Sequence, residues 1–184
     1  MKVGHIIPYL SDCRSLLDFG CGDLSLVSGL KKILPDLRIT GVDVVDFCIR
    51  PNGILFTKYN GEKLPFKNNS FDVVIAYHVL HHTDDPQKLF AECARVVRKK
   101  ILLVEPVPRV SFERPFMMIL DWVFNVWKNK TIRMPFAFLS ESMWYKLFHF
   151  HHLGVVVNKD IEPFPRWLPT GRSHLFVLHK NPKK

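Results

Sequence analysis

The first hundred residues alternate short apolar runs with stretches whose apolar residues recur at helical spacing. Residues 15–19, 38–43, 54–58, 71–77 and 101–104 are typical of buried strands. The run at 71–77 is so uniformly apolar that it should be a central strand, covered on both faces. Because strands that alternate with helices fold into a parallel sheet, the sequence predicts an α/β fold with helices on both faces.

Helix starts and late strands complete this prediction. Asp85, with a proline directly after it, is a typical helix start. We expect a later helix to begin at Ser140 and to end at Gly154. Two further strands, at 155–157 and 175–178, bring the total to seven. The predicted architecture is a doubly wound, mostly parallel seven-stranded sheet that ends in a hairpin.

A chain of 184 residues fits one domain, and we expect residues 1–184 to form it. Within it, residues 109–139 look like an insertion over the carboxyl edge of the sheet, a lid that selects the substrate. The run from Phe116 to Trp127 is more apolar than a surface loop normally is. Two interpretations remain open, a lid helix packed into the core or a face for a hydrophobic acceptor or a membrane. In the second, anionic headgroups would meet Arg109, Arg114, Lys128, Lys130 and Arg133.

Charge is divided unevenly along the chain. Residues 1–92 carry 10 Lys+Arg against 11 Asp+Glu, a net of −1, and residues 93–184 carry 16 against 6, a net of +10. No apolar run reaches the roughly 20 residues that span a bilayer, and no signal-peptide pattern is present. The cysteines form no Cys-x-x-Cys pair. We expect a cytoplasmic protein, with peripheral contact to an anionic membrane open and nucleic-acid binding less favoured.

The strongest local motif is the glycine turn between the first strand and the first helix, Asp18-Phe19-Gly20-Cys21-Gly22-Asp23. Its glycines allow a tight turn and a close approach of the backbone to a ligand. Asp43 ends the second strand, 21 residues after Gly22, where a carboxylate can accept both hydroxyls of a ribose. Together the turn and this aspartate predict a nucleoside site.

Charge around the glycine turn separates two classes of cofactor. A dinucleotide places its pyrophosphate at the helix N-terminus and usually needs a third glycine, where this chain has Ser25. Asp18 and Asp23 would repel that pyrophosphate. The same carboxylates would attract the ammonium and sulfonium groups of S-adenosylmethionine (SAM), which is therefore the predicted cofactor.

These segments resemble the class I SAM-dependent methyltransferases of the small-molecule type. The likeness is carried by residues 17–23, 40–43, 60–66 and 70–74, and by His81-His82. The resemblance implies that Asp18 holds the methionine amino group, Asp43 binds the ribose diol and Val44 packs on adenine. It implies further cofactor contacts from Phe19, Gly20, Cys21, Gly22, Asn60, Gly61, Tyr77 and His78.

Methyl transfer is an in-line displacement that needs a base only if the acceptor carries a proton. The candidate catalytic residues are His78, His82 and Tyr77. His78 and His82 are four residues apart and would share a helical face, but no third ligand is evident, so we predict no metal site. We expect His81 to point into a helix interface, and Glu105 either faces the substrate or is a plain strand-end carboxylate.

The function that we expect is transfer of a methyl group from SAM to a small, hydrophobic or anionic acceptor. One alternative is an RNA methyltransferase, although the segment 76–79 lacks the Asn/Asp-Pro-Pro-aromatic motif of enzymes that methylate base amines. Another is a non-catalytic subunit that binds cofactor poorly and serves as a scaffold for a partner. Leu24 in place of a glycine and Asn60 in place of the family's usual aspartate keep that alternative open.

Overall fold

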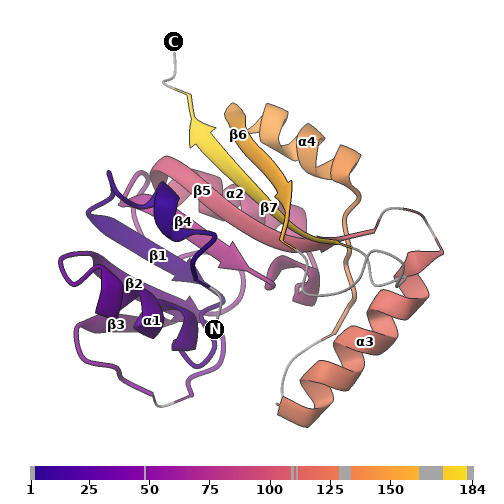
Figure 1. Ribbon diagram of the computed structural model, residues 1–184, viewed down its shortest axis with the longest axis horizontal. Coiled ribbons are helices and arrows are strands. Elements are labelled where there is room, and N and C mark those ends of the chain that lie inside the picture. Colours follow the sequence, from indigo (N-terminus) through magenta and orange to yellow (C-terminus); the bar gives the residue numbers. More distant parts are fainter. Residues whose placement is uncertain are drawn as a thin grey trace.

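A computed structural model gives the arrangement of the chain (Figure 1). It describes residues 3–47, 49–108, 110, 112–128, 134–161 and 172–181, with the side chains of 124–128 and 172 excepted. Of the basic residues expected around the lid, Arg109, Lys130 and Arg133 lie outside the described residues, as does the side chain of Lys128.

One sheet of seven strands forms the centre of the molecule, in the order β3-β2-β1-β4-β5-β7-β6. Only β7 runs antiparallel to its neighbours, β5 and β6. The doubly wound, mostly parallel sheet with a closing hairpin is therefore confirmed. The strand bounds are β1 Ser15–Phe19, β2 Arg38–Asp43, β3 Ile54–Lys58, β4 Phe71–Tyr77, β5 Val97–Val107, β6 Leu153–Asp160 and β7 Arg172–Lys180.

Helices cover both faces of this sheet, as predicted. Helices α2 (Pro86–Val96) and α4 (Glu141–Phe150) pack on one face through Phe90, Trp144 and Phe148. Helix α1 (Ser25–Ile33) covers the other face, together with the N-terminal segment that holds the 3-10 turn η1 (Ile7–Tyr9). Helix α3 (Glu113–Lys128) instead stands away from the sheet, at the lower right of Figure 1. Among the helices described, none is both long enough and apolar enough to cross a bilayer.

Both predicted helix starts are confirmed. The Asp85 carboxylate accepts the Lys88 N–H at 2.9 Å and caps α2, and Ser140 caps α4. The predicted end at Gly154 is wrong, because α4 ends at Phe150 and Gly154 lies inside β6. His152, with a φ of +55°, supplies the left-handed residue that ends the helix.

Strand β5 begins earlier than predicted, at Val97 instead of residue 101. The basic run that follows Val97 looks like a turn, but carboxylates neutralise it. Arg98 lies 2.9 Å from Asp72 of the neighbouring strand β4, and Lys100 lies 2.5 Å from Asp12, which precedes β1. These ion pairs let charged residues occupy a strand position beside β4.

Candidate functional site

A cavity of about 460 Å³ opens at the edge where β1 to β4 end. In a doubly wound sheet this edge is where ligands bind, and the volume is typical of a small-molecule site. The cavity brings together seven predicted site residues, which lie at the ends of β1 to β4 or in the segments that follow them: Gly20, Gly22, Asp43, Val44, Gly61, His78 and His82. The predicted residues that do not line it are Asp18, Phe19, Cys21, Asn60 and Tyr77.

Asp43 ties the glycine turn to the end of β2. Its Oδ2 accepts the Gly22 N–H at 2.8 Å and its Oδ1 accepts the Val45 N–H at 3.0 Å. A carboxylate offers about four acceptor positions, so each oxygen keeps one for a hydroxyl. Asp43 therefore both shapes the turn and can receive a ribose.

Asp18 lies in β1 at the base of the turn and is only 2% exposed. Its buried Oδ2 has no hydrogen-bond partner among the residues that the structure describes. Burial, together with the nearby carboxylates of Asp43 and Asp23, raises the pKa of Asp18 to about 8. A cation beside this group would favour its charged form and supply the missing hydrogen bond, so the position suits a ligand that brings a positive charge.

Gly20 is required by close packing and by its conformation. Its φ is +67°, and a Cβ at this position would lie 2.0 Å from Cγ2 of Val79, a residue that lines the cavity. Gly22 differs, because a Cβ there would meet no atom within 4 Å. The first glycine thus holds the turn against the segment after β4, and the second leaves open space at the cavity.

His78 directly follows β4 and adopts a left-handed φ of +51°. Its ring is open to the cavity, and its Nε2 lies 2.7 Å from Oγ of Ser173. His78 is an exposed residue, and partial desolvation by the surrounding protein lowers the pKa of its ring, although Glu105 opposes that shift. Tyr77 stacks on the His78 ring, with centroids 5.0 Å apart, and does not line the cavity.

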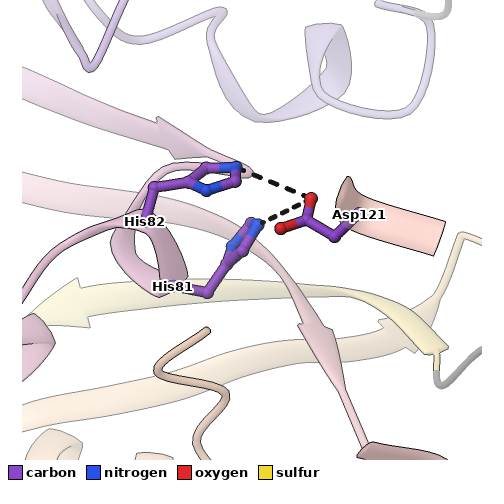
Figure 2. A group of neighbouring side chains, drawn as sticks. All are labelled: His81, His82 and Asp121. Atoms are coloured by element: carbon purple, nitrogen blue, oxygen red, sulfur yellow. Dashed lines mark ion pairs between the residues drawn. The ribbon is translucent and has the colours of Figure 1, made fainter. Parts of the chain in front are cut away.

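The expectation that His78 and His82 share a helical face is wrong. The left-handed residue at His78 turns the chain, and His82 ends a separate 3-10 turn, η2 (Leu80–His82). His82 instead lies beside His81, with ring centroids 4.0 Å apart. Both rings approach the same oxygen of Asp121, from α3 (Figure 2).

Glu105 is a buried carboxylate that holds this segment and does not line the cavity. Its Oε1 accepts the N–H groups of Val79 and Leu80, and its Oε2 lies 2.5 Å from Nδ1 of His81. Burial alone would lower the pKa of His81, but the carboxylates of Glu105 and Asp121 raise it to about 9. His81 therefore points into the interface between η2, β5 and α3, close to what we expected.

Several cavity residues were missed by sequence reasoning. Tyr59 directly follows β3, and its position after a strand could have indicated it. Thr83, Asp84, Asp85, Lys88 and Leu89 line the cavity from the start of α2. The Asp85 cap was visible in the sequence as a helix start, but nothing local indicated that this helix end faces the cavity.

A family model described as a methyltransferase domain matches residues 17–104, from β1 through most of β5. This segment contains the glycine turn, Asp43, His78 and the His81–His82 pair. This segment, just under half of the chain, is similar to a methyltransferase domain.

Three proteins illustrate this likeness. An uncharacterized methyltransferase of Schizosaccharomyces pombe is 28% identical over 110 residues, 51% of this chain and 40% of that protein. The phthiotriol/phenolphthiotriol dimycocerosates methyltransferase of Mycobacterium leprae is 32% identical over 92 residues, 46% of this chain and 34% of that protein. The matches thus span well under half the length of these curated relatives. Magnesium protoporphyrin IX methyltransferase of Synechocystis, solved with bound S-adenosylhomocysteine (SAH), shares the fold with a TM-score of 0.66 at 14% identity, covering 97% of this chain and 82% of that one.

The two departures from the methyltransferase pattern have structural roles. Leu24 adopts a left-handed φ of +60° before α1. Its side chain is buried against Gly41, where an added Cβ would lie only 2.4 Å from Cδ2 of Leu24. Asn60 uses its Oδ1 to accept the Glu62 N–H at 3.0 Å and so shapes the loop after β3. Phe19 and Cys21 are core residues beside them. Neither departure fills the cavity.

Proposed function

We propose that this chain binds SAM in the cavity and transfers its methyl group to a small acceptor that is apolar or anionic. The observation that carries the proposal is Asp18 at the base of the glycine turn, a buried carboxylate whose Oδ2 has no hydrogen-bond partner in the described part of the chain. The family match supports the same cofactor. A cationic ligand would relieve the uncompensated burial of this group.

The family pattern and the geometry support the following binding roles. Asp18, which does not line the cavity, holds the methionine ammonium through water, and Asp43 accepts hydrogen bonds from the ribose hydroxyls. Val44 and the backbone N–H of Gly61 border the adenine, and both residues line the cavity. Bound SAM supplies a methyl group already activated by the sulfonium, so the chain has mainly to align the acceptor and exclude water.

We propose that His78 is the base that removes a proton from the acceptor. It lines the cavity after the central strand and its imidazole is neutral near pH 7, while the lowered pKa also makes it a weaker base than an ordinary histidine. Tyr77 is less suited because it does not line the cavity, and burial raises the pKa of its hydroxyl. His82 also lines the cavity, next to Asp121.

The exposed side chains of α3 support an apolar acceptor. Phe116, Ile119 and Trp122 are 49%, 60% and 54% exposed, more apolar surface than a helix usually presents to water. We propose that this face receives a hydrophobic acceptor and, with Arg114 exposed at its start, contacts an anionic membrane surface at its periphery. The Mycobacterium leprae relative, named for dimycocerosates, fits an acceptor of this class.

Binding measurements with SAM, SAH and NAD test the proposal. We expect SAM and SAH to raise the melting temperature and to bind in calorimetry, and NAD to do neither. Asp43→Ala, and Asp43→Asn in case the alanine variant folds poorly, should weaken SAM binding at least about 10-fold, because each hydrogen bond to a charged group contributes about 1.5–3 kcal/mol. Asp36→Asn, at an exposed carboxylate outside the cavity, is the control. Stabilisation by NAD alone, or full SAM affinity in both Asp43 variants, would overturn the proposal.

A further inference from the structure

Two histidines and one aspartate converge at the junction of η2 and α3 (Figure 2). The Nε2 atoms of His81 and His82 lie 3.6 and 3.7 Å from the same Oδ1 atom of Asp121. One ligand atom from each residue can be chosen so that all three lie within 4.8 Å of one another. We propose that these three side chains bind a divalent transition-metal ion of the zinc class.

The spacing fits an ion better than direct hydrogen bonds. Both contacts with the Asp121 oxygen exceed the usual 2.7–3.2 Å of an N–H···O bond. Ligands that each lie about 2.0–2.1 Å from a tetrahedral zinc are separated by about 3.3–3.4 Å. The two separations from Asp121 exceed this value by only a few tenths of an ångström, and the ligand atoms of all three residues lie within 4.8 Å of one another.

The orientation of His81 gives a second, independent observation. Glu105, itself 1% exposed, lies 2.5 Å from its Nδ1, which directs Nε2 toward Asp121. A carboxylate on the far nitrogen of a histidine ligand is the usual arrangement behind a bound metal ion. Phe138 stacks on the His81 ring at 5.2 Å, so the ring is also held from its face. On binding, the ion takes the place of a proton on Nε2 of His81, and Nδ1 keeps its contact with Glu105.

The third ligand is positioned by α3. Met117 is 3% exposed and lies one helical turn before Asp121, so its burial turns the same helix face inward. Asp121 is the one acidic residue of α3 after its first turn, and it lies on this inward stripe. An ion at this place would link α3 to η2, two elements that are separated by a long stretch of the chain.

The donor set defines the class of ion. Two imidazole nitrogens with one carboxylate suit Zn²⁺, Co²⁺ or Fe²⁺, whereas Mg²⁺ and Ca²⁺ prefer oxygen ligands. Three protein ligands leave at least one coordination position for water or another oxygen. Because His82 also lines the cavity, that position lies near the proposed acceptor region. The proposal does not depend on SAM binding.

A titration with Co²⁺ and Zn²⁺ tests the site on the full chain after removal of metals with a chelator. We expect one equivalent of Co²⁺ to give the visible absorption of a four- or five-coordinate ion, and Zn²⁺ to displace it and raise the melting temperature. His82→Ala and Asp121→Asn, both at partly exposed positions, should each weaken binding at least about 100-fold, and Glu105→Gln about 10–100-fold.

Another adjacent histidine pair provides the matched control. His151 and His152 follow α4 on a different part of the molecule, and their double replacement by alanine should leave the Co²⁺ spectrum and the stoichiometry unchanged. Circular dichroism shows whether each variant is folded. Absence of the visible band in the wild type, retention of full affinity in both His82→Ala and Asp121→Asn, or loss of binding in the His151/His152 variant would each overturn the proposal.

Discussion

The glycine turn after β1 and helix α3 differ in how the chain specifies them. In the turn, backbone geometry decides almost everything: Gly20 has a left-handed φ and packs against Val79, and Asp43 accepts a backbone N–H. Helix α3 buries Met117 but leaves Ile119 and Trp122 largely exposed. The comparison indicates that the glycine turn tolerates little change, whereas the surface of α3 can change its side chains at little cost in stability.

The largest effect should come from Gly20→Ala. The added Cβ would lie 2.0 Å from Val79 in a backbone conformation that costs an L-residue about 1–2 kcal/mol, and overpacking adds about 1–3 kcal/mol. We expect the free energy of unfolding, measured with urea, to fall by about 3 kcal/mol. Gly22→Ala is the control, since open space surrounds it and only about 1 kcal/mol should be lost. An equal loss in the two variants would contradict this account of the turn.

Asp18→Asn should change the free energy of unfolding by an intermediate amount, and it should stabilise the folded chain instead of destabilising it. The pKa of Asp18 is about 8 in the folded chain and about 3.9 when unfolded, so the folded state holds one proton more between these values. Stability contributed by the protonated form is therefore lost as pH rises from about 4 to about 8. We expect the asparagine variant to be more stable than the wild type by about 2 kcal/mol at pH 8, and by less at pH 5.

Thermal unfolding of both proteins across this pH range measures the difference. The same variant should bind SAM at least about 10-fold more weakly, because the amide cannot balance an ammonium. A stability gap that stays constant with pH would show that Asp18 does not titrate in this range. Asp36→Asn again serves as the exposed control.

The smallest effect on stability should come from the exposed face of α3. Ile119→Ser and Trp122→Ser should each change the free energy of unfolding by no more than about 0.5 kcal/mol. Co-sedimentation with vesicles that contain phosphatidylserine should nevertheless decrease in both. Leu55→Ser, at a 71% exposed position on β3, is the control and should leave sedimentation unchanged. Equal sedimentation of all variants, or indifference to anionic lipid, would count against a membrane contact.

Much of the fold was predictable because its signals are local. Buried runs and their flanking turns gave the strands, and caps such as Asp85 and Ser140 gave two helix starts. The errors arose where tertiary contacts override local patterns. The basic residues at the start of β5 are accommodated by Asp72 and Asp12, and the end of α4 depends on a left-handed histidine in place of glycine.

The part of the candidate site that lies in local motifs was also predictable from the sequence. Gly20, Gly22 and Asp43 belong to motifs whose spacing along the chain reflects one strand, one turn and the next strand. Asp121 could not be found in this way, because it reaches His81 and His82 from a separate helix about 40 residues later in the sequence. The packing of Met117 and of Glu113, which precede Asp121 on the same helix face, turns that face inward.

The path of the chain around α3 has an evolutionary consequence. The backbone leaves the sheet after Val107 and returns beside η2, where the Ala137 N–H donates to the carbonyl of His81 at 3.0 Å. Because exit and return lie at the same edge, we expect that the intervening stretch can be exchanged between relatives without changing the connections within the sheet. If α3 receives the acceptor as proposed, such an exchange would change acceptor preference and leave the glycine turn and Asp43 in place.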